Sequence, residues 1–396
     1  MTWIPPVADI LPEDSSDAAL VGRAWLPEAS GPAIVTLRDS EVHDLSATFP
    51  TMRDLAEQPD PAVAVREATG TPIGALTTIW TNTDPDLRDP SRPWLLSPID
   101  LQVIKAAGVT FPASMLERII EERARGDAAS AESIRSTIMD AIGGDIADLV
   151  PGSPAAARLK DVLLEAGLWS QYLEVGIGPD AEIFTKAPVL ASVGPGTDVG
   201  VLAESEWNNP EPEVVLLVAS TGTIVGAALG NDVNLRDVEG RSALLLGRAK
   251  DNNASASVGP FIRLFDAGFT LDHVRHETVS LTVTGEDGFR MTASSDMTQI
   301  SRDPADLVRQ TAGDHHSYPD GFALYLGTMF APTEDRDLPG QGFTHHPGDI
   351  VRISSPRLGA LVNRVRHSQR VPPWEFGIGA LVSSLAQRDL IGRTTR

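Results

Sequence analysis

The chain contains no cysteine and almost no lysine, and both absences are informative. Without cysteine, disulfides, thiolate nucleophiles and cysteine-ligated zinc are excluded. The only lysines are Lys105, Lys160, Lys186 and Lys250, and all other basic residues apart from histidine are arginine. A lysine close to a candidate site is therefore of interest, because lysine can titrate in a protein and arginine cannot.

Long hydrophobic runs and an excess of positive charge are also lacking. No apolar segment approaches the ~18 residues of a membrane span, and the stretch MTWIPPVADILPEDSSD lacks the basic and apolar regions of a signal peptide. The net charge of −22 argues against nucleic acid or an anionic membrane as the main partner. The negative charge does not exclude a small anionic substrate, because a bound cation reverses the local field. We expect a soluble, cytoplasmic protein.

The chain divides into three parts by its local patterns. Residues 1–97 contain the β-like runs AIVTL and ALTTIW among many prolines, which predicts a small β-rich N-terminal domain. Residues 98–173 predict a helical connecting segment, with helical spacing in PASMLERIIEERARG, SAESIRSTIMDAIGG and PAAARLKDVLLEAGLW. Residues 174–396 predict a mostly β catalytic domain that ends in the helical pattern EFGIGALVSSLAQR. The expected fold class is α+β, mostly β.

The stretch WNNPEPEVVLLVASTGTIVGAALGNDVNLRD places carboxylates at the ends of apolar runs. Residues two apart in a strand share a face, so Glu211 and Glu213 project the same way. A hairpin turn centred between Thr221 and Gly222 pairs Glu211 with Asp232 and places Gly230 opposite Glu213, which leaves room beside the carboxylates. Three carboxylates are therefore expected to converge at the open end of one hairpin.

Three converging carboxylates repel one another unless a cation joins them. The alternative interpretation is a solvated strand end, where each carboxylate is hydrated by water. The runs VVLLVA and IVGAALG do not alternate, which indicates that both faces of the hairpin are buried. An all-oxygen ligand set favours a hard cation, Mg²⁺ before Mn²⁺ or Ca²⁺. Such an ion would keep open positions for the carboxylate and keto oxygens of a 2-oxo acid.

Two further segments extend this group of residues. Glu182 and Lys186 lie on the expected strand AEIFTKAP and share a face with Phe184. Lys250 follows Asp232 in the chain. A lysine beside a dication has a depressed pKa and can serve as a base. A structural salt bridge to one of the carboxylates is the alternative.

These residues resemble the fumarylacetoacetate hydrolase superfamily. Its motifs match Glu211-Pro-Glu213, NDVNLRD at 231–237 and then Lys250. Further matches are TKAPVLASVGPG, LGTMFAP and HPGDIVRISSPRLGALVNRV, so the likeness covers residues 182–365. The resemblance implies a mixed β-roll catalytic domain, a homodimer or homotetramer, and Mg²⁺ at the two glutamates and Asp232.

Within the superfamily, the sequence resembles the 2-keto-3-deoxy-arabinonate dehydratases. The hydrolases add an acidic ligand and a catalytic histidine upstream, whereas IKAAGVTFPASMLERIIEER contains no histidine and no acid before Glu117. The dehydratase branch carries a glutamate before its Glu-x-Glu, and Glu182 stands 29 positions before Glu211. Asn234 stands where serine is usual.

The resemblance implies a dehydratase acting on a 2-keto-3-deoxy sugar acid. Lys250 would remove a C3 proton, and Glu182 would help the C4 hydroxyl leave as water. A pentonate substrate would give 2-oxoglutarate semialdehyde. Thr328 would hydrogen-bond the substrate carboxylate. Lys186 and Arg236 are further candidate substrate-binding residues, although Arg236 is better suited to bracing the metal loop than to contacting the substrate.

Two other functions remain open from the sequence. A hydrolase or decarboxylase of the same fold, acting on acylpyruvates or oxaloacetate, would use the same metal with an activated water near Glu182. A non-enzymatic binding protein that kept the fold is the third alternative. The complete ligand set and Lys250 argue against it.

Overall fold

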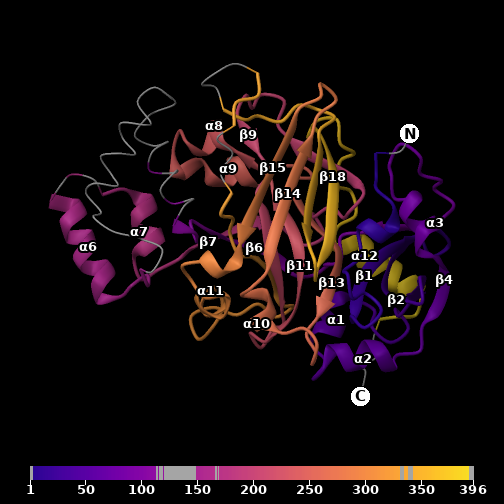
Figure 1. Ribbon diagram of the computed structural model, residues 1–396. Helices are drawn as coiled ribbons and strands as arrows, with labels where there is room; N and C mark the ends of the chain where they lie inside the picture. The colour runs from indigo at the N-terminus through magenta and orange to yellow at the C-terminus, as the bar shows by residue number, and fades with distance from the viewer. Residues whose placement is uncertain are drawn as a thin grey trace.

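Two packed β-sheets form the centre of the molecule, with helices around them (Figure 1). The structure, a computed structural model, describes residues 3–112, 115, 119, 149–165, 167, 169–330, 334–337 and 342–391. The expected helices SAESIRSTIMDAIGG and most of PASMLERIIEERARG lie outside the described residues.

The larger sheet has eleven strands, and most neighbours run antiparallel. Its order is β4 (Thr71–Ala75), β3 (Glu41–Asp44), β2 (Gly31–Arg38), β1 (Leu20–Leu26), β13 (Ala256–Leu264), β11 (Ile224–Asp232), β10 (Pro212–Val218), β16 (Phe322–Tyr325), β6 (Val103–Gly108) and β7 (Glu182–Ala187), with β5 (Trp94–Leu96) paired to β1. β10 and β11 therefore lie in the middle of this sheet.

The second sheet has five strands. Its order is β15 (Arg290–Asp296), β14 (Thr278–Thr284), β17 (Ile350–Ser355), β18 (Gly359–His367) and β8 (Thr197–Val201), and a separate pair joins β12 (Asn234–Leu235) to β9 (Asn208–Asn209). Alternate residues of β10 face different layers. Val214 and Leu216 belong to the core shared with the second sheet, whereas Val215 and Leu217 pack in a core with residues of the N-terminal helices. The hairpin is buried on both faces, as its non-alternating sequence predicted.

Helices lie outside the sheets, and several are short. They are α1 (Met52–Ala56), α2 (Pro61–Glu67), α3 (Leu76–Thr81), α6 (Pro154–Glu165), α7 (Gln171–Ile177), α8 (Arg236–Glu239), α9 (Leu246–Lys250), α10 (Leu271–Val274), α11 (Pro304–Thr311) and α12 (Ile378–Gln387), with 3-10 turns η1 (Val7–Asp9), η2 (Pro27–Ala29), η4 (Ala243–Leu245) and η5 (Met297–Gln299). The helices expected in PAAARLKDVLLEAGLW and EFGIGALVSSLAQR are confirmed as α6 and α12. α12 lies beside the N-terminal strands (Figure 1).

Three features differ from the sequence-based expectation. ALTTIW, expected as a β-like run, forms α3, because Leu76, Ile79 and Trp80 are buried at helical spacing. VIKAAG at 103–108, expected within a helical segment, forms β6, because pairing with β16 and β7 overrides its weak local preference. The larger sheet also crosses the expected division at residue 97, since β1 pairs with β13.

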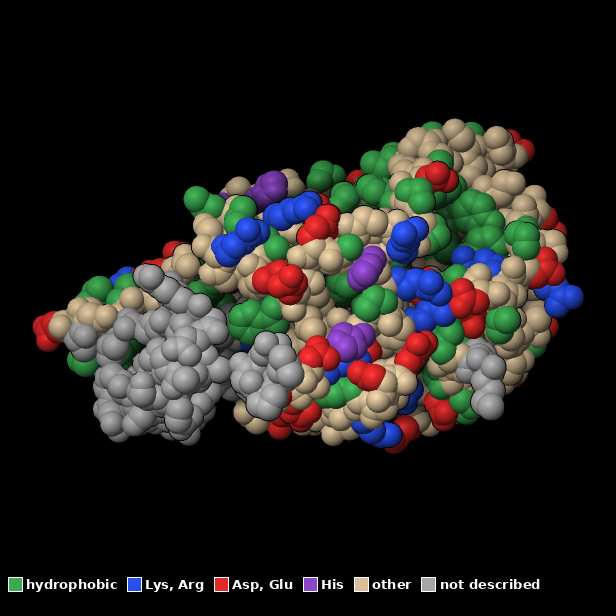
Figure 2. Space-filling view, turned by 90° about the horizontal axis from the view of Figure 1, so that it is seen from above, with side chains coloured by type: hydrophobic (Ala, Val, Ile, Leu, Met, Phe, Trp, Pro, Cys, Tyr) green, Lys and Arg blue, Asp and Glu red, His purple; other side chains and the backbone are tan. Residues whose placement is uncertain are grey.

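On the face shown in Figure 2, acidic and basic side chains are interspersed, and histidines lie singly among them. None of the helices among the described residues is both long and apolar enough to cross a membrane.

Candidate active site

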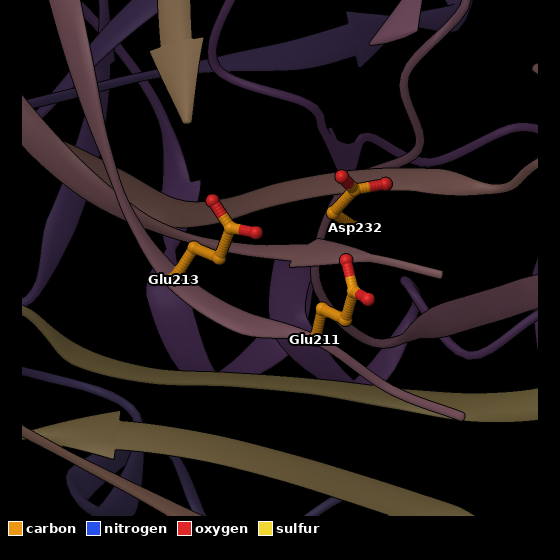
Figure 3. Close-up of side chains that lie close together, drawn as sticks. All are labelled: Glu211, Glu213 and Asp232. Carbon is orange, nitrogen blue, oxygen red and sulfur yellow. The ribbon is translucent and has the colours of Figure 1, made fainter. Parts of the chain in front are cut away.

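Glu211, Glu213 and Asp232 converge at the open end of the β10–β11 hairpin (Figure 3). All three are buried, and each offers an oxygen within 4.8 Å of the others. The hairpin register is the one the turn predicted: Glu213 lies opposite Gly230, and the backbone N–H of Asp232 donates to the carbonyl of Glu211 at 3.0 Å. The turn itself is centred on Thr221 rather than between Thr221 and Gly222, which shifts the pairing by one position, and a β-bulge between Leu217 and Val218 restores the predicted pairing. The turn and the bulge together therefore set which carboxylates meet.

Backbone and amide groups hold two of these carboxylates in place. The side-chain oxygen of Asn231 accepts from the N–H of Glu211 at 3.1 Å. The N–H of Gly327, just past β16, donates to Oε2 of Glu213 at 2.6 Å. Gly327 has a φ of +90°, and a Cβ there would lie 2.0 Å from Oγ1 of Thr110. Glycine is thus required for this donor to reach Glu213.

The space beside Gly230 is filled, in contrast to the room expected there. A Cβ on Gly230 would lie 2.4 Å from the ring of Tyr325. The Tyr325 hydroxyl donates to the carbonyl of Ser257 at 2.7 Å. Burial raises the pKa of Tyr325 well above its ordinary value, so the hydroxyl stays protonated. Gly230 therefore admits a packed ring next to the carboxylates.

Two lysines meet the carboxylates from different sides. Lys186 on β7 is fully buried, with Nζ 2.7 Å from Oδ1 of Asp232. It also donates to the carbonyl of Val233 at 2.9 Å and to the carbonyl of Lys250. Lys250, the last residue of α9, contacts Oε2 of Glu211 and lies 3.2 Å from Oδ2 of Asp232. The sequence placed both lysines in the site, and the structure brings both to the carboxylates.

The electrostatic balance of the group favours a further cation. Two ammonium groups face three carboxylates. Burial, reinforced by Asp232 and Glu211, raises the pKa of Glu213 well above its usual range. Burial alone would raise the pKa of Asp232, but Lys186 and Lys250 hold it below its ordinary value. Burial lowers the pKa of Lys186, although Asp232 opposes this. A divalent cation would offset the excess negative charge, and three carboxylates are the donor set of a hard ion.

A pocket opens over the carboxylates and brings the other candidates together. It is lined by Gly108, Glu182, Phe184, Asn209, Glu211, Glu213, Asp232, Arg236, Glu239, Lys250, Gly327, Thr328 and Phe330, among others. Glu182 comes from the start of β7, Thr328 from the segment after β16, and Arg236 from the first position of α8. The Arg236 guanidinium lies 4.4 Å above the ring of Trp207. Lys186 is enclosed behind this wall.

Sequence reasoning did not single out Glu239 or Gly108. Glu239 lies at the end of α8, and its carboxylate accepts from the side-chain amide of Asn234 at 2.6 Å. Asn234, which stands where serine is usual, thus holds the carboxylate of Glu239 at the pocket. Glu239 follows Asn234 by five positions, across the end of β12 and the short helix α8, so no local pattern in the sequence marked it. Gly108 lies opposite Glu182, where a Cβ would come within 2.2 Å of the carboxylate.

Comparison with known proteins gives relatives of one kind. No family profile matches the chain. A "Probable 2-keto-3-deoxyxylonate dehydratase" of Haloferax volcanii is 30% identical over 204 residues, 51% of this chain and 65% of that protein. A 2-dehydro-3-deoxy-D-arabinonate dehydratase of Saccharolobus solfataricus is 28% identical over 193 residues, 48% of this chain and 60% of that protein. In both comparisons the chain matches less than two thirds of the relative's length.

Solved structures extend the likeness to the fold. The apo form of 2-keto-3-deoxy-D-arabinonate dehydratase superposes with a TM-score of 0.61 at 19% identity, over 88% of this chain and 99% of that one. A complex of the same enzyme with magnesium and 2,5-dioxopentanoate gives a TM-score of 0.60 at 19% identity, with the same coverage. At such identities the likeness shows the fold. The chain is therefore similar in sequence and in fold to 2-keto-3-deoxy sugar acid dehydratases, which confirms the resemblance predicted from its motifs.

Proposed function

We propose that this protein is a Mg²⁺-dependent dehydratase of a 2-keto-3-deoxy sugar acid. A 2-keto-3-deoxypentonate is the proposed substrate, with 2-oxoglutarate semialdehyde as the product. The observation that carries the proposal is the position of Lys250, which contacts two of the three metal-binding carboxylates in a pocket that Glu182 also lines. The names of the relatives support the reaction class, and the magnesium complex of a protein with the same fold supports the ion.

Glu211, Glu213 and Asp232 would hold the ion. When bound, Mg²⁺ would polarise the substrate's C1 carboxylate and C2 keto oxygens, and its charge would favour the neutral amine of Lys250. Mn²⁺ and Ca²⁺ suit the same oxygen donors less closely.

The side chains then divide the proton transfers. The Lys250 amine takes a proton from C3, and the electron pair of that C–H bond moves into the C2–C3 bond as an enolate. Glu182 donates a proton to the C4 hydroxyl, the C4–O bond breaks, and water leaves. The C2 keto group re-forms as a C3=C4 double bond appears. A proton then moves from C5 to C3, and the resulting C5 enol tautomerises to the semialdehyde. Thr328 hydrogen-bonds the substrate carboxylate, and Arg236, stacked on Trp207, braces the loop that carries Asp232.

The test is a substrate panel assayed with Mg²⁺ and with chelator. We expect semialdehyde from a 2-keto-3-deoxypentonate with Mg²⁺, and none in chelator. Loss of acylpyruvate or oxaloacetate without semialdehyde formation would instead identify a hydrolase or decarboxylase. Full dehydratase activity with metal shown to be absent would contradict the role of the three carboxylates.

A further inference from the structure

A second cavity lies away from the candidate active site. It has a volume of about 190 Å³ and shares no lining residue with the pocket over the carboxylates. Its walls come from β1, β5, the loop between β7 and β8, and Phe376 ahead of α12. Four segments far apart in the chain therefore build one hollow. Gly194 allows the loop between β7 and β8 to approach β5 closely, since a Cβ there would lie 2.4 Å from the backbone of Leu96.

Aromatic rings form one wall of this second cavity. Trp25 and Trp94 are cross-strand neighbours on β1 and β5. Their rings stack with centroids 5.6 Å apart, and Phe376 meets Trp25 edge-on at 5.3 Å. All three side chains are only half-buried. Large half-buried rings around a hollow offer apolar contact surface to a ligand with a flat ring.

Positive charge forms the other part of the lining. Arg23 is 5% exposed and donates to the carbonyls of Ser97 at 3.2 Å and Ile99 at 2.6 Å. Burial lowers its pKa, and Asp100, with an oxygen 3.8 Å away, opposes this. A guanidinium stays protonated in such a setting. Arg88 adds a second guanidinium, 4.8 Å from the centroid of Trp94.

The described part of the second cavity's lining lacks acidic residues, although the chain as a whole is strongly acidic. The chain carries a net charge of −22. Yet the described residues that line the second cavity include two arginines and neither Asp nor Glu. The hydroxyls of Ser97 and Ser192 hydrogen-bond each other at 2.6 Å, so one of the two keeps a hydrogen that it can donate to an anion. Asp100 faces Arg23, and Asp84 and Asp198 act on Arg88, but none of these carboxylates lines the hollow. The charges that the described lining itself presents are therefore the two guanidinium groups, which favour an anion.

We propose that the second cavity binds a small organic anion that carries a flat ring. The ring packs against Trp25 and Trp94, and the anionic group meets the guanidinium groups of Arg23 and Arg88. The volume of about 190 Å³ suits a ligand with a single ring. A carboxylate and a phosphate share this chemistry, because both present two oxygens to a guanidinium. The site is separate from the metal centre and does not depend on the proposed dehydratase activity.

Benzoate is the probe for the test, titrated into the full chain by calorimetry. Chelator is present, so that the carboxylate cannot bind through a metal ion. We expect a dissociation constant on the order of 1 mM, as suits a ligand of few atoms. Benzyl alcohol, which lacks the charge, and cyclohexanecarboxylate, which lacks the flat ring, should each bind at least about tenfold more weakly. Phenyl phosphate titrated in parallel shows whether carboxylate or phosphate is preferred.

Two variants and two matched controls locate the binding. Arg88→Gln and Trp94→Leu should each weaken benzoate binding about tenfold or more. Arg92→Gln and Trp169→Leu should leave it unchanged, because neither residue lines the cavity, and Trp169 is half-buried like Trp94. Arg88→Gln keeps the test valid if Trp94→Leu folds poorly. Absence of benzoate binding, equal binding of benzyl alcohol, or full binding in Arg88→Gln would overturn the proposal.

Discussion

Lys186 and Lys250 both contact Asp232, but their surroundings give them different tasks. The three hydrogens of the Lys186 ammonium are matched by Asp232, the Val233 carbonyl and the Lys250 carbonyl. Lys186 thus ties a metal-binding carboxylate to the backbone of the proposed base. Lys250 lines the pocket, where its amine can reach a substrate. We therefore propose that Lys186 positions the site and does not bind substrate.

The role of Lys250 is tested by comparing two substitutions. Lys250→Met should stop both dehydration and the exchange of the C3 hydrogens with deuterated water, while metal binding survives. Lys250→Arg should not restore either, because arginine stays protonated. Exchange is followed by NMR and metal binding by calorimetry. Substantial turnover in Lys250→Arg would reduce Lys250 to a salt-bridge partner of Glu211 and Asp232.

Glu182 is the proposed acid. Glu182→Gln keeps its size but cannot donate a proton, so turnover should fall about 10²-fold or more. Metal affinity should stay unchanged, since Glu182 is not among the three metal-binding carboxylates. Glu206→Gln, on the exposed surface, is the matched control. Unchanged turnover in Glu182→Gln would reassign this residue to structure.

Lys186 gives a prediction about stability. Lys186→Met leaves Asp232 buried without its nearest ammonium, and breaking a buried pair costs about 3–5 kcal/mol. The exposed pair of Lys160 and Glu174 has a comparable N–O distance of 2.6 Å, yet Lys160→Met should cost only about 0–1 kcal/mol. Urea unfolding of both variants measures the difference. Equal losses would show that the Lys186 contact contributes no more than a surface pair.

At the scale of elements, the segment after β16 is as important as the hairpin for holding the carboxylates in place. Gly327→Ala should lower stability and weaken metal binding, because its Cβ would displace Thr110 and the N–H that holds Glu213. Gly222→Ala is the matched control. Gly222 also has a positive φ, of +82°, but open space around its Cβ position, so only backbone strain of about 1 kcal/mol remains. Unfolding and metal titration of both variants separate strain from displacement. Normal metal affinity in Gly327→Ala would contradict this account.

The hairpin and its register could be predicted from sequence because the turn and the apolar runs are local signals. The burial of Lys186 could not be predicted, since it depends on the contacts of β7 with α9 and with Asp232, which are distant from it in the sequence. Glu239 was missed for a different reason: α8 has only four residues, too few to show helical periodicity in the sequence. β6 was also not predicted, because its two neighbours in the sheet come from distant parts of the chain. Features that depend on neighbouring residues could thus be predicted from the sequence, whereas packing between distant segments could not.

For the whole molecule, the larger sheet is continuous from the N-terminal strands to the hairpin that carries the candidate metal ligands. β1 pairs with β13, and β13 pairs with β11. The N-terminal strands therefore extend the same sheet that carries Asp232. The stability of the fold against acid depends on a different group of residues, which lies just before β17. There Asp349 accepts from Arg336 at 2.6 Å and lies 3.1 Å from Nδ1 of His345.

Asp349 gives a prediction about stability against pH. Burial alone would raise its pKa, but hydrogen bonds from Arg336 and His345 lower the pKa from 3.8 to about 2. A carboxyl with a lowered pKa stabilises the fold fully above its ordinary pKa, and the contribution is lost as pH falls toward the lowered value. Asp349→Asn should therefore be less stable than the parent at pH 6, by at most about 2 kcal/mol after allowance for solvent screening. The gap should narrow as pH falls from about 4 toward 2. Urea unfolding across this range measures it, with the exposed Asp272→Asn as control. A gap that stays constant with pH would show that the ion pair is not its cause.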